Sequence, residues 1–273
     1  MENIKLSFII PTYNSEDFIE DCLNSIFSQT YKNYEIIVID DCSTDETLNI
    51  LKKYNNIKIL STPKNSRQGA ARNIGLNNCT GDYVLFVDAD DSLYSNDVLE
   101  KLTNEITKKV YPDIIYLGFK MVGNRDLLLM PDKVNSTKKY RLSENPFINV
   151  FSVCWKNELL QKNDIRFPEN IRYEDVYFAF LGIEKAQTYS YTDFIYYKYN
   201  NRASSTTTTY TLDQSMDTIK LINELINLYD KIDEKNFPYL ESRIKQQVDR
   251  ASVRLNRAID FQINLKSNIK RAN

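Results

Sequence analysis

Three carboxylates in four positions, Asp88, Asp90 and Asp91, directly follow an apolar run at residues 83–87. The run predicts a buried parallel strand, and open α/β sheets bind their ligands at the carboxyl ends of such strands. Carboxylates this close repel one another, so they stay ionised together only around a cation. Their oxygens suit Mg²⁺ or Mn²⁺ shared with substrate phosphates. The alternative is a solvated acidic turn that caps the next helix, with Asp91 or Ser92 as the cap.

The chain contains no histidine. This absence excludes Ser-His-Asp and Cys-His catalysis, zinc sites that use histidine, and an imidazole base. Acid–base chemistry must therefore use carboxylates, or else Lys, Tyr or Cys.

The composition is that of a soluble globular protein, with 42% hydrophobic and 26% charged residues among 273. This length suits one large α/β domain, alone or with a helical appendage. No apolar stretch approaches the roughly 20 residues that span a bilayer, and no signal peptide precedes the first strand pattern. Four cysteines without metal or redox spacing predict reduced thiols in a cytoplasmic protein, and the net charge of −2 argues against nucleic-acid binding.

Strand and helix patterns alternate through the first half of the chain. The strand patterns lie at residues 6–10, 35–40, 57–61 and 83–87, and the helical patterns at 16–28, 45–54, 68–77 and 97–108. Strands separated by helices of about 10 residues predict a parallel, doubly wound sheet.

The second half is less regular. A strand pattern at 113–118 precedes a polar stretch, 119–145, which we interpret as a long excursion or loop. Structure resumes over 150–160. The remaining patterns are a helix at 174–185, strands at 188–192 and 194–199, and long helices at 213–232 and 238–266.

Polar side chains follow four consecutive predicted strands. These groups are Pro11–Asn14, Asp40–Asp45, Gly69–Asn73 and Asp88–Asp91. Each alone also fits a turn or a helix cap. Together they place an amide, paired acids, an arginine and a metal-type acidic cluster at one edge of the sheet.

The same segments resemble glycosyltransferase family 2. The resemblance is carried by Phe8–Asn14, Gln29–Asp45, Gly69–Leu76 and Val87–Asp91, in that order. It is near consensus over residues 4–95, continues in outline to about residue 206, and does not include the last sixty or so residues. It implies a GT-A fold, a Rossmann-like, mostly parallel α/β sheet flanked by helices, here with a C-terminal helical extension. We therefore expect a catalytic domain at 1–210, divided into a nucleotide-binding half (1–95) and an acceptor-side half (96–210), and a helical region at 211–273.

The resemblance implies a nucleoside-diphosphate-sugar donor, usually a UDP-sugar, and inversion at the anomeric carbon. Pro11, Thr12 and Asn14 would line the nucleotide pocket. Asp41 would bind the base, most plausibly the uracil N3–H, and Arg72 would face the base or the diphosphate.

The acidic cluster matches the family's metal motif, which also includes Ala89. By the resemblance, Asp88 would approach the ribose or the metal, and Asp90 would be the principal ligand of Mn²⁺ or Mg²⁺, with Asp91 in support. A divalent cation would offset the charge that builds on the departing UDP.

An acid pair further along, Glu174 and Asp175, matches the family's pair ahead of an apolar helix. Inversion by direct displacement needs a base on the face opposite UDP. The resemblance assigns this role to Asp175, with Glu174 in reserve. Two acids that stabilise a helix N-terminus are the alternative.

Two weaker matches complete the implied site. The segment 197–205 resembles a loop that closes over the diphosphate, with Arg202 as the phosphate partner, and a flexible strand end is the alternative. Trp155, in a segment that resembles one near the donor or acceptor, fits a plain core residue equally well.

The last helical pattern has an apolar stripe beside an arginine stripe, and eight basic against three acidic residues from Glu241 to Asn273. One interpretation is peripheral contact with an anionic membrane that holds a lipid-linked acceptor. The other is packing of the apolar stripe on the catalytic domain or on a partner chain, such as a second copy or a further domain, with the arginines solvated.

The resulting hypothesis is transfer of a hexose, N-acetylhexosamine or hexuronate to a hydroxyl of a bacterial surface glycan, such as capsular polysaccharide or lipooligosaccharide. One rival is a magnesium-dependent phosphohydrolase of the haloacid dehalogenase type, although its nucleophilic Asp follows the first strand. Another is a non-catalytic nucleotide-sugar-binding module of a larger protein. A nucleotide-dependent dehydrogenase is excluded, because no G-x-G-x-x-G occurs among the six glycines.

Overall fold

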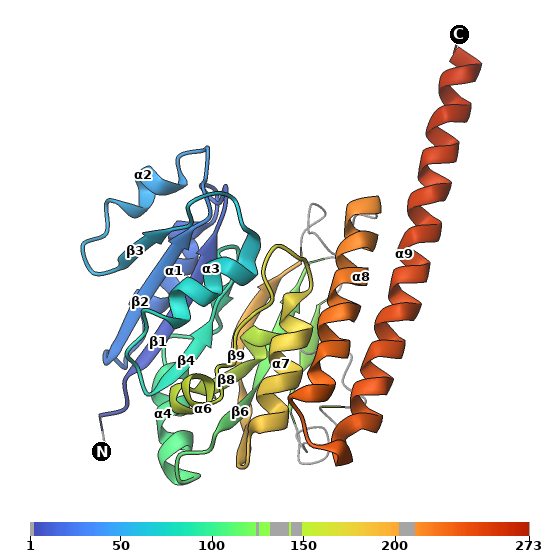
Figure 1. Cartoon of the computed structure of the whole chain (residues 1–273). Helices are drawn as coiled ribbons and strands as arrows, with labels where there is room; N and C mark the ends of the chain where they lie inside the picture. The colour runs from blue at the N-terminus through green and yellow to red at the C-terminus, as the bar shows by residue number, and fades with distance from the viewer. Residues whose placement is uncertain (1–2, 124–125, 132–141, 143–148, 202–210, 273) are drawn as a thin grey trace.

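The computed structural model describes residues 3–123, 126–131, 142, 149–201 and 211–272, with side chains up to residue 259 (Figure 1). Four parallel strands form the N-terminal half of the sheet. They are β1 (Leu6–Thr12), β2 (Tyr34–Asp40), β3 (Lys58–Ser61) and β4 (Tyr83–Phe86), in the order β3-β2-β1-β4. Thr12 pairs with Asp40, so β1 and β2 end at the same level. The predicted α/β sheet is confirmed.

Alternate residues of β1 enter two different cores. Phe8 packs in the core that contains α1 (Ile19–Phe27) and α4 (Val98–Lys108). Ile9 packs in the core that contains α3 (Arg67–Leu76) and α7 (Glu174–Lys185). Successive strand side chains point to opposite faces, and helices cover both faces, so all seven residues of β1 are buried. The remaining helix of this half, α2 (Thr47–Leu51), is shorter than the pattern at 45–54 predicts.

The second half extends the sheet beyond β4. The strands β6 (Ile114–Val122), β8 (Val153–Lys156) and β9 (Tyr189–Asn200) continue it in the order β8-β6-β9. β8 is antiparallel to both β4 and β6, whereas β9 is parallel to β6. The two-residue strand β5 (Ser92–Leu93) pairs antiparallel with the end of β9. This pairing brings β9 against the acidic turn that precedes β5.

Two expectations for this half are wrong. The excursion at 119–145 begins inside β6 and contains a further strand, β7 (Leu127–Leu129), which pairs with β6. The two patterns at 188–192 and 194–199 form one strand, β9. A shift in the β6–β9 register, between Tyr116 and Gly118, accommodates the polar interruption. The segment at 150–160 divides into a 3-10 turn, β8 and the helix α6 (Asn157–Lys162).

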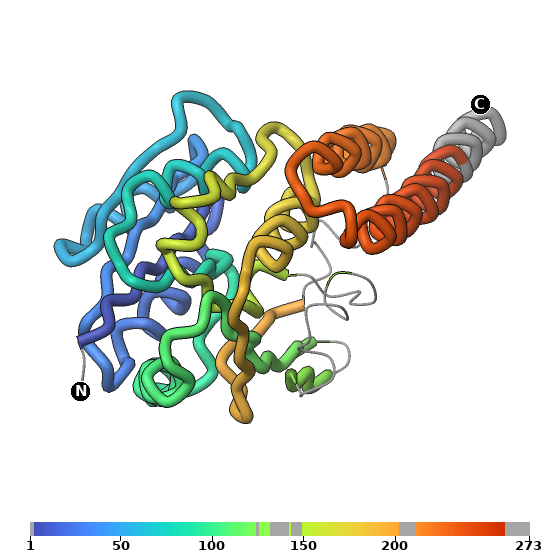
Figure 2. The backbone as a smooth tube through the Cα atoms, turned by 60° about the horizontal axis from the view of Figure 1, so that its bottom comes forward, coloured from blue at the N-terminus to red at the C-terminus, as the bar shows by residue number. Residues whose placement is uncertain are grey.

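The C-terminal region is a helical hairpin against α7, as Figures 1 and 2 show. It consists of α8 (Leu212–Ile226) and α9 (Phe237–Ala272), joined by the 3-10 turns η2 (Asn227–Asp230) and η3 (Glu234–Asn236). Four of its leucines are buried in the same core as Ile9: Leu221, Leu225, Leu228 and Leu240. The division at residue 210 stays a prediction. Within the described ranges, no helix combines the length and the apolar character that crossing a bilayer requires.

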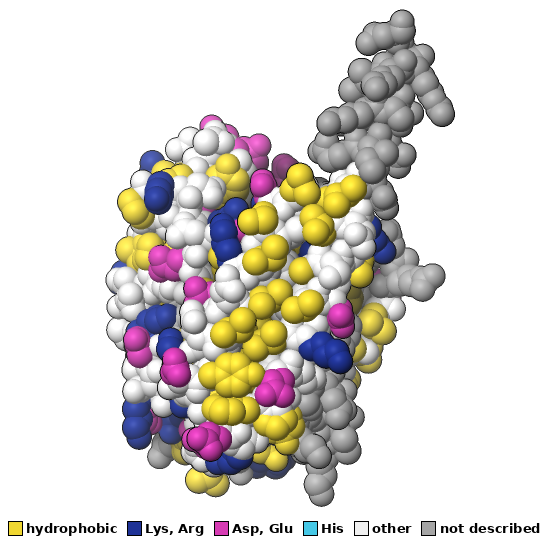
Figure 3. Space-filling model, turned by 45° about the vertical axis from the view of Figure 1, so that its right-hand side comes forward, with side chains coloured by type: hydrophobic (Ala, Val, Ile, Leu, Met, Phe, Trp, Pro, Cys, Tyr) yellow, Lys and Arg dark blue, Asp and Glu magenta, His cyan; other side chains and the backbone are white. Residues whose placement is uncertain are grey.

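The outward face of this hairpin carries exposed apolar side chains, which gather over α8 and α9 in Figure 3. The large apolar residues that are exposed in the two helices are Leu212, Met216, Ile219 and Ile226 in α8, and Val248, Val253, Leu255 and Ile259 in α9.

Some arginines of α9 point inward instead. Arg243 is buried and donates to the Leu142 carbonyl at 3.1 Å, and Arg254 lies 3.8 Å over the Tyr173 ring. Arginine contributes long apolar stems as well as charge, so it packs well in such positions. Solvated arginines are therefore wrong for Arg243 and Arg254, and packing on the catalytic domain is wrong for Val248, Leu255 and Ile259. Packing of these three residues on a partner chain stays a prediction.

Candidate active site

The nucleotide-side residues lie where β1 and β2 end. The Asp41 N–H donates to the Thr12 carbonyl at 2.8 Å, and Asn14 Oδ1 accepts from the Thr44 N–H at 2.8 Å. Asn14 is exposed, with a left-handed φ of 48°. Pro11 and Thr12 are buried, and Thr12 Oγ1 has no hydrogen-bond partner in the described part of the chain. The structure brings these residues together at one edge.

Asp41 is buried and anchors the loop that leads into α3. Its Oδ1 accepts from Thr62 Oγ1 at 2.6 Å and from the Ser66 N–H at 2.8 Å. Its Oδ2 accepts from the Arg67 N–H at 2.7 Å. A carboxylate oxygen can accept two hydrogen bonds, so Oδ2 retains capacity for one more donor. The predicted contact with a base stays a prediction.

The acidic turn after β4 is tied to the end of β9. Tyr197 Oη donates to Asp91 Oδ2 at 2.8 Å, and the Asn200 N–H donates to Asp91 Oδ1 at 2.7 Å. Tyr197 Oη also accepts from the Asp88 N–H at 3.0 Å, and Asn200 Nδ2 donates to the Asp90 carbonyl at 2.8 Å. Ala89 is buried between these acids. Tyr197 and Asn200 were not singled out as site residues from the sequence. Both lie in the segment 197–205, which resembles the family's diphosphate loop, but there only Arg202 was assigned a role.

Two acids of this turn have contrasting surroundings, since Asp88 has a cationic partner and the pKa of Asp91 is strongly raised. Burial, followed by the charges of Asp88 and Asp90, raises the pKa of Asp91 to about 8, against the hydrogen bonds from Asn200 and Tyr197. Asp88 is paired with Arg72 at 2.8 Å, whereas Asp90 is half-buried at the edge of the turn. The charges of Asp88 and Asp90 thus disfavour the ionised form of Asp91, which a bound cation would favour.

Carboxylate oxygens fit a hard divalent cation. Within the described residues, no three acidic or cysteine side chains converge closely enough to hold an ion unaided. Phosphate oxygens of a bound donor would have to complete the coordination shell. The assignment of Asp88, Asp90 and Asp91 as ligands stays a prediction.

Arg72 joins the acidic turn to the acid pair on α7. Its side chain is buried, with one guanidinium nitrogen 2.8 Å from Asp88 Oδ1 and another 2.5 Å from Glu174 Oε1. Burial alone would lower the pKa of Arg72, but Asp88, Glu174 and Asp175 together raise it. Its guanidinium also lies 5.4 Å from the centre of the Phe167 ring. The predicted contact of Arg72 with a base or diphosphate stays untested.

The acid pair begins α7. Glu174 is buried, and burial raises its pKa against the opposing charge of Arg72. Asp175 is half-buried; burial and the neighbouring Glu174 carboxylate raise its pKa to about 7. A carboxyl with a pKa near neutrality suits a general base, because it is deprotonated at working pH yet basic enough to take a proton.

Gly69 permits the close approach of α3 to this acid pair. A Cβ at residue 69 would lie 2.5 Å from the Pro168 carbonyl oxygen and 3.1 Å from Glu174 Cγ. Any larger residue would push the 168–174 segment away from Arg72.

Two further sequence-based assignments have different outcomes. Arg202 lies outside the described residues. Trp155 is fully buried and packs edge-on against Phe178, 5.3 Å between ring centres, which confirms the interpretation as a core residue.

A helix-flanked α/β sheet with acidic turns at its carboxyl edge is the arrangement of the GT-A glycosyltransferases, as predicted. Residues 7–165 match the model of Glycosyl transferase family 2. The chain belongs to this family.

Its relatives include glycosyltransferases named for poly(ribitol-phosphate). TarS of Staphylococcus aureus (strain MW2), a poly(ribitol-phosphate) beta-N-acetylglucosaminyltransferase, is 34% identical over 176 residues, which are 62% of this chain and 30% of TarS. A poly(ribitol-phosphate) beta-glucosyltransferase of Bacillus spizizenii is 35% identical over 213 residues, which are 71% of this chain and 32% of that protein. The chain thus spans under a third of the length of these curated relatives.

Solved structures agree with the family. The crystal structure of S. aureus TarS 1-349 in complex with UDP-GlcNAc has a TM-score of 0.72 and 28% identity, over 90% of this chain and 72% of that one. The mannosyltransferase PcManGT from Pyrobaculum calidifontis, in complex with GDP-Man and Mn²⁺, has a TM-score of 0.61 at 18% identity, over 98% of this chain and 80% of that one. This second likeness concerns the fold alone.

Proposed function

We propose that this chain is an inverting glycosyltransferase that moves a sugar from a UDP-sugar to a hydroxyl of a bacterial surface glycan. Asp175 is the base, Glu174 the reserve carboxylate, and Asp88, Asp90 and Asp91 carry a divalent cation, Mn²⁺ or Mg²⁺. The family match leaves no ground for the phosphohydrolase alternative.

One observation carries the proposal: the ionic chain from Asp88 through Arg72 to Glu174, with pair distances of 2.8 and 2.5 Å. Asp175, whose pKa is raised to about 7, follows Glu174, the last residue of these ion pairs. These contacts support the proposal, because they link the proposed cation site to the proposed base, as a direct displacement requires.

The reaction balances as follows. Asp175 takes the proton of the acceptor hydroxyl, whose oxygen forms the new bond to the anomeric carbon. The bond between that carbon and the diphosphate oxygen breaks on the opposite face, so the configuration inverts and UDP leaves with the electron pair. A bound divalent cation would supply the charge that stabilises the departing diphosphate.

The relatives guide the choice of substrates to test. TarS is named for N-acetylglucosamine transfer and the Bacillus enzyme for glucose transfer, both to poly(ribitol-phosphate). UDP-GlcNAc and UDP-glucose are therefore the first donors to examine, followed by UDP-hexuronates. Poly(ribitol-phosphate) joins capsular polysaccharide and lipooligosaccharide as a candidate acceptor.

The direct test is release of UDP from each member of a UDP-sugar panel, with and without candidate acceptors, in Mn²⁺ or Mg²⁺. We expect slow hydrolysis of one donor, acceleration by the correct acceptor, and a product of opposite anomeric configuration by NMR. Binding of UDP without turnover of any donor, across all acceptors, would favour a non-catalytic binding module.

Membrane contact remains part of the proposal. The exposed apolar side chains of α8 and α9 belong to a C-terminal region with eight basic against three acidic residues from Glu241 to Asn273, a combination that suits an anionic surface. We expect co-sedimentation with phosphatidylglycerol vesicles and not with phosphatidylcholine vesicles. Light scattering without lipid tests the alternative, that a second copy of the chain covers this face.

A further inference from the structure

Asp217, on α8, is a buried carboxylate that three cations share. Its side chain is only 2% exposed. Arg67 and Arg172 both contact Oδ2, Arg172 at 2.6 Å, and Lys220 Nζ lies 3.6 Å from Oδ1. Two guanidinium groups on one oxygen would repel each other without this carboxylate, so Asp217 holds together two segments that are distant in sequence.

The two arginines come from segments that carry site residues. Arg67 begins α3, and its N–H donates to Asp41 Oδ2 at 2.7 Å. Its guanidinium also donates to the Asn170 carbonyl at 3.3 Å. Arg172 precedes Glu174 by two positions and Asp175 by three. Asp217 is thus linked through one side chain to each of the two predicted functional segments.

The segment before the acid pair has an unfavourable backbone that needs such support. Asn170 and Tyr173 have φ values of 61° and 66°, both in the left-handed region. For a bulky residue such as Tyr this conformation is unfavourable, and it persists only when surrounding contacts hold it.

The neighbouring helix adds a second restraint. Arg254 of α9 covers the Tyr173 ring at 3.8 Å and donates to Thr218 Oγ1 at 2.7 Å. Thr218 is the residue next to Asp217. The C-terminal hairpin therefore contacts the strained segment through two arginines that converge on adjacent residues of α8.

We propose that Asp217 is a positioning residue for the acid pair, acting through Arg172 and Arg67 and touching no substrate. The C-terminal hairpin is by this inference a working part of the transferase, since it sets where Asp175 stands relative to Arg72 and the acidic turn. This inference rests on the proposed function in assigning catalysis to Asp175.

The test uses Asp217→Asn in the full chain. Without the carboxylate charge the two arginines separate and the 170–175 segment relaxes, and displacement of a base by about 1 Å costs up to about 10²-fold in rate. We expect kcat to fall about 10- to 100-fold while KM for the donor and Kd for UDP change less than threefold. Asp41 keeps its bonds from Thr62 and Ser66, so donor binding survives. We also expect faster amide hydrogen exchange in peptides that cover residues 168–178.

Two further variants serve as controls for the measurements on Asp217→Asn. Asp213→Asn makes the same chemical change at an exposed position of the same helix, and its kcat and exchange should equal those of the wild type. Asp217→Glu keeps the charge and should recover part of the lost kcat. Should Asp217→Asn not fold, Arg172→Gln replaces it, because Asp217 then keeps Arg67 and Lys220; a smaller loss of kcat with faster exchange is expected.

Hydrogen exchange separates this inference from the proposed function. Unchanged exchange over residues 168–178, or unchanged kcat in an active enzyme, overturns the positioning role. If the wild type transfers no sugar, the proposed function fails, and the exchange result alone decides whether Asp217 holds the segment.

Discussion

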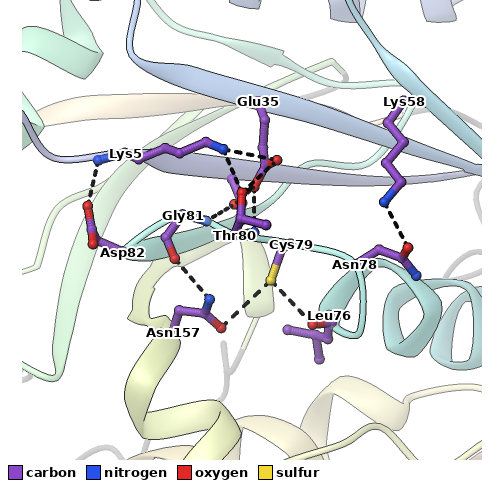
Figure 4. Close-up of polar contacts among 11 residues, drawn as sticks. Lys5, Glu35, Lys58, Leu76, Asn78, Cys79, Thr80, Gly81, Asp82 and Asn157 are labelled. Atoms are coloured by element: carbon purple, nitrogen blue, oxygen red, sulfur yellow. Dashed lines mark hydrogen bonds and ion pairs between the residues drawn. The ribbon is translucent and has the colours of Figure 1, made fainter.

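Carboxylates at the two ends of the same sheet have opposite surroundings. At the amino end, Figure 4 shows Glu35 surrounded by donors: Ser7 Oγ at 2.5 Å, the Thr80 N–H at 2.6 Å and Lys5 Nζ at 3.3 Å. Burial would raise its pKa, but the hydrogen bonds from Ser7 and Thr80 outweigh burial and leave the pKa lowered. At the carboxyl end, Asp91 and Asp175 have pKa values raised to about 8 and about 7.

The difference distinguishes an acid that stabilises the fold from acids that we propose take part in catalysis. Glu35 has its oxygens satisfied by the protein, so nothing remains for a ligand to supply. Asp91 and Asp175 face other acids, so each gains from a proton or a cation that arrives from outside. Both ends belong to one rigid sheet, which makes them internal controls for each other.

The largest expected contrast comes from the acidic turn. Asp90→Ala should lower transfer by about 10³-fold and abolish UDP binding in Mn²⁺, because the cation loses its principal ligand. Asp82→Ala is the control at the amino end, where the carboxylate accepts only from the Lys5 N–H at 2.7 Å. Titration with UDP, followed by calorimetry with and without EDTA, measures this binding. A UDP affinity that EDTA does not change would contradict the metal assignment.

Loss of the base should be the next largest effect. Asp175→Asn keeps shape and hydrogen-bonding capacity but cannot take a proton, so transfer should fall about 10²-fold or more. UDP binding should be retained, because the acidic turn is intact. Single-turnover kinetics with saturating donor measure this, and full turnover by the variant would place the base elsewhere.

The raised pKa of Asp175 predicts the pH dependence of transfer. The base must be deprotonated, so kcat/KM should fall about tenfold per pH unit below about 7 and level off above it. Rates between pH 5 and 9 in a constant-ionic-strength buffer test this. A kcat/KM that stays constant from pH 5.5 to 8 would contradict the assignment of Asp175 as the base.

Glu35 should affect stability and not catalysis. Glu35→Gln removes the charge and one of the two acceptor oxygens that bind Thr80, Lys5 and the buried Ser7, which we expect to lower the free energy of unfolding by about 1–3 kcal/mol at pH 7. Because the pKa of Glu35 is lowered in the folded protein, its ionised form stabilises the fold at pH values above the ordinary carboxyl pKa. This stabilisation is lost as the pH falls through the pKa that Glu35 has in the folded protein. Urea unfolding at pH 7 and pH 3 measures both, with exposed Glu20→Gln as the control; unchanged kcat completes the contrast.

Asp91 should affect stability with the opposite sign. Its raised pKa means that the metal-free fold prefers the protonated acid, so stability is lost as pH rises from about 4 towards 8. The Tm of the wild type should therefore fall by several degrees over this pH range. Asp91→Asn mimics the protonated acid, so its Tm should not show this fall. Calorimetry in EDTA tests this, and identical pH curves for both proteins would contradict it.

Much of the first half was predictable because its signals are local. The apolar run of β4 and the acids that follow it are contiguous in sequence, as are the turns after β1 and β2. Their shared edge follows from parallel pairing. The misjudged parts depend on distant partners. The interruption within β9 resembles a turn until its pairing with β6 is known, and β7 consists of three residues.

The contacts that organise the site are also distant in sequence. Arg72 meets Glu174 across 102 positions, and Arg67 meets Asp217 across 150. No pattern along the chain reports such pairs, so the sequence indicates Arg72 and Glu174 as separate functional residues and says nothing of Asp217. The buried Arg243 was misjudged for the same reason, since helical periodicity does not reveal which stripe meets the neighbouring helix.

The core shared by α7 and the hairpin sets a limit on shortening the protein. A truncation after residue 210 would leave the partners of Leu221, Leu225, Leu228 and Leu240 without cover. Each such leucine represents about 1.5–3 kcal/mol of burial, which is a large share of the stability of a typical domain. A fragment that ends at residue 210 would expose this apolar surface to solvent and aggregate. Expression trials with this protein should therefore keep both α8 and α9.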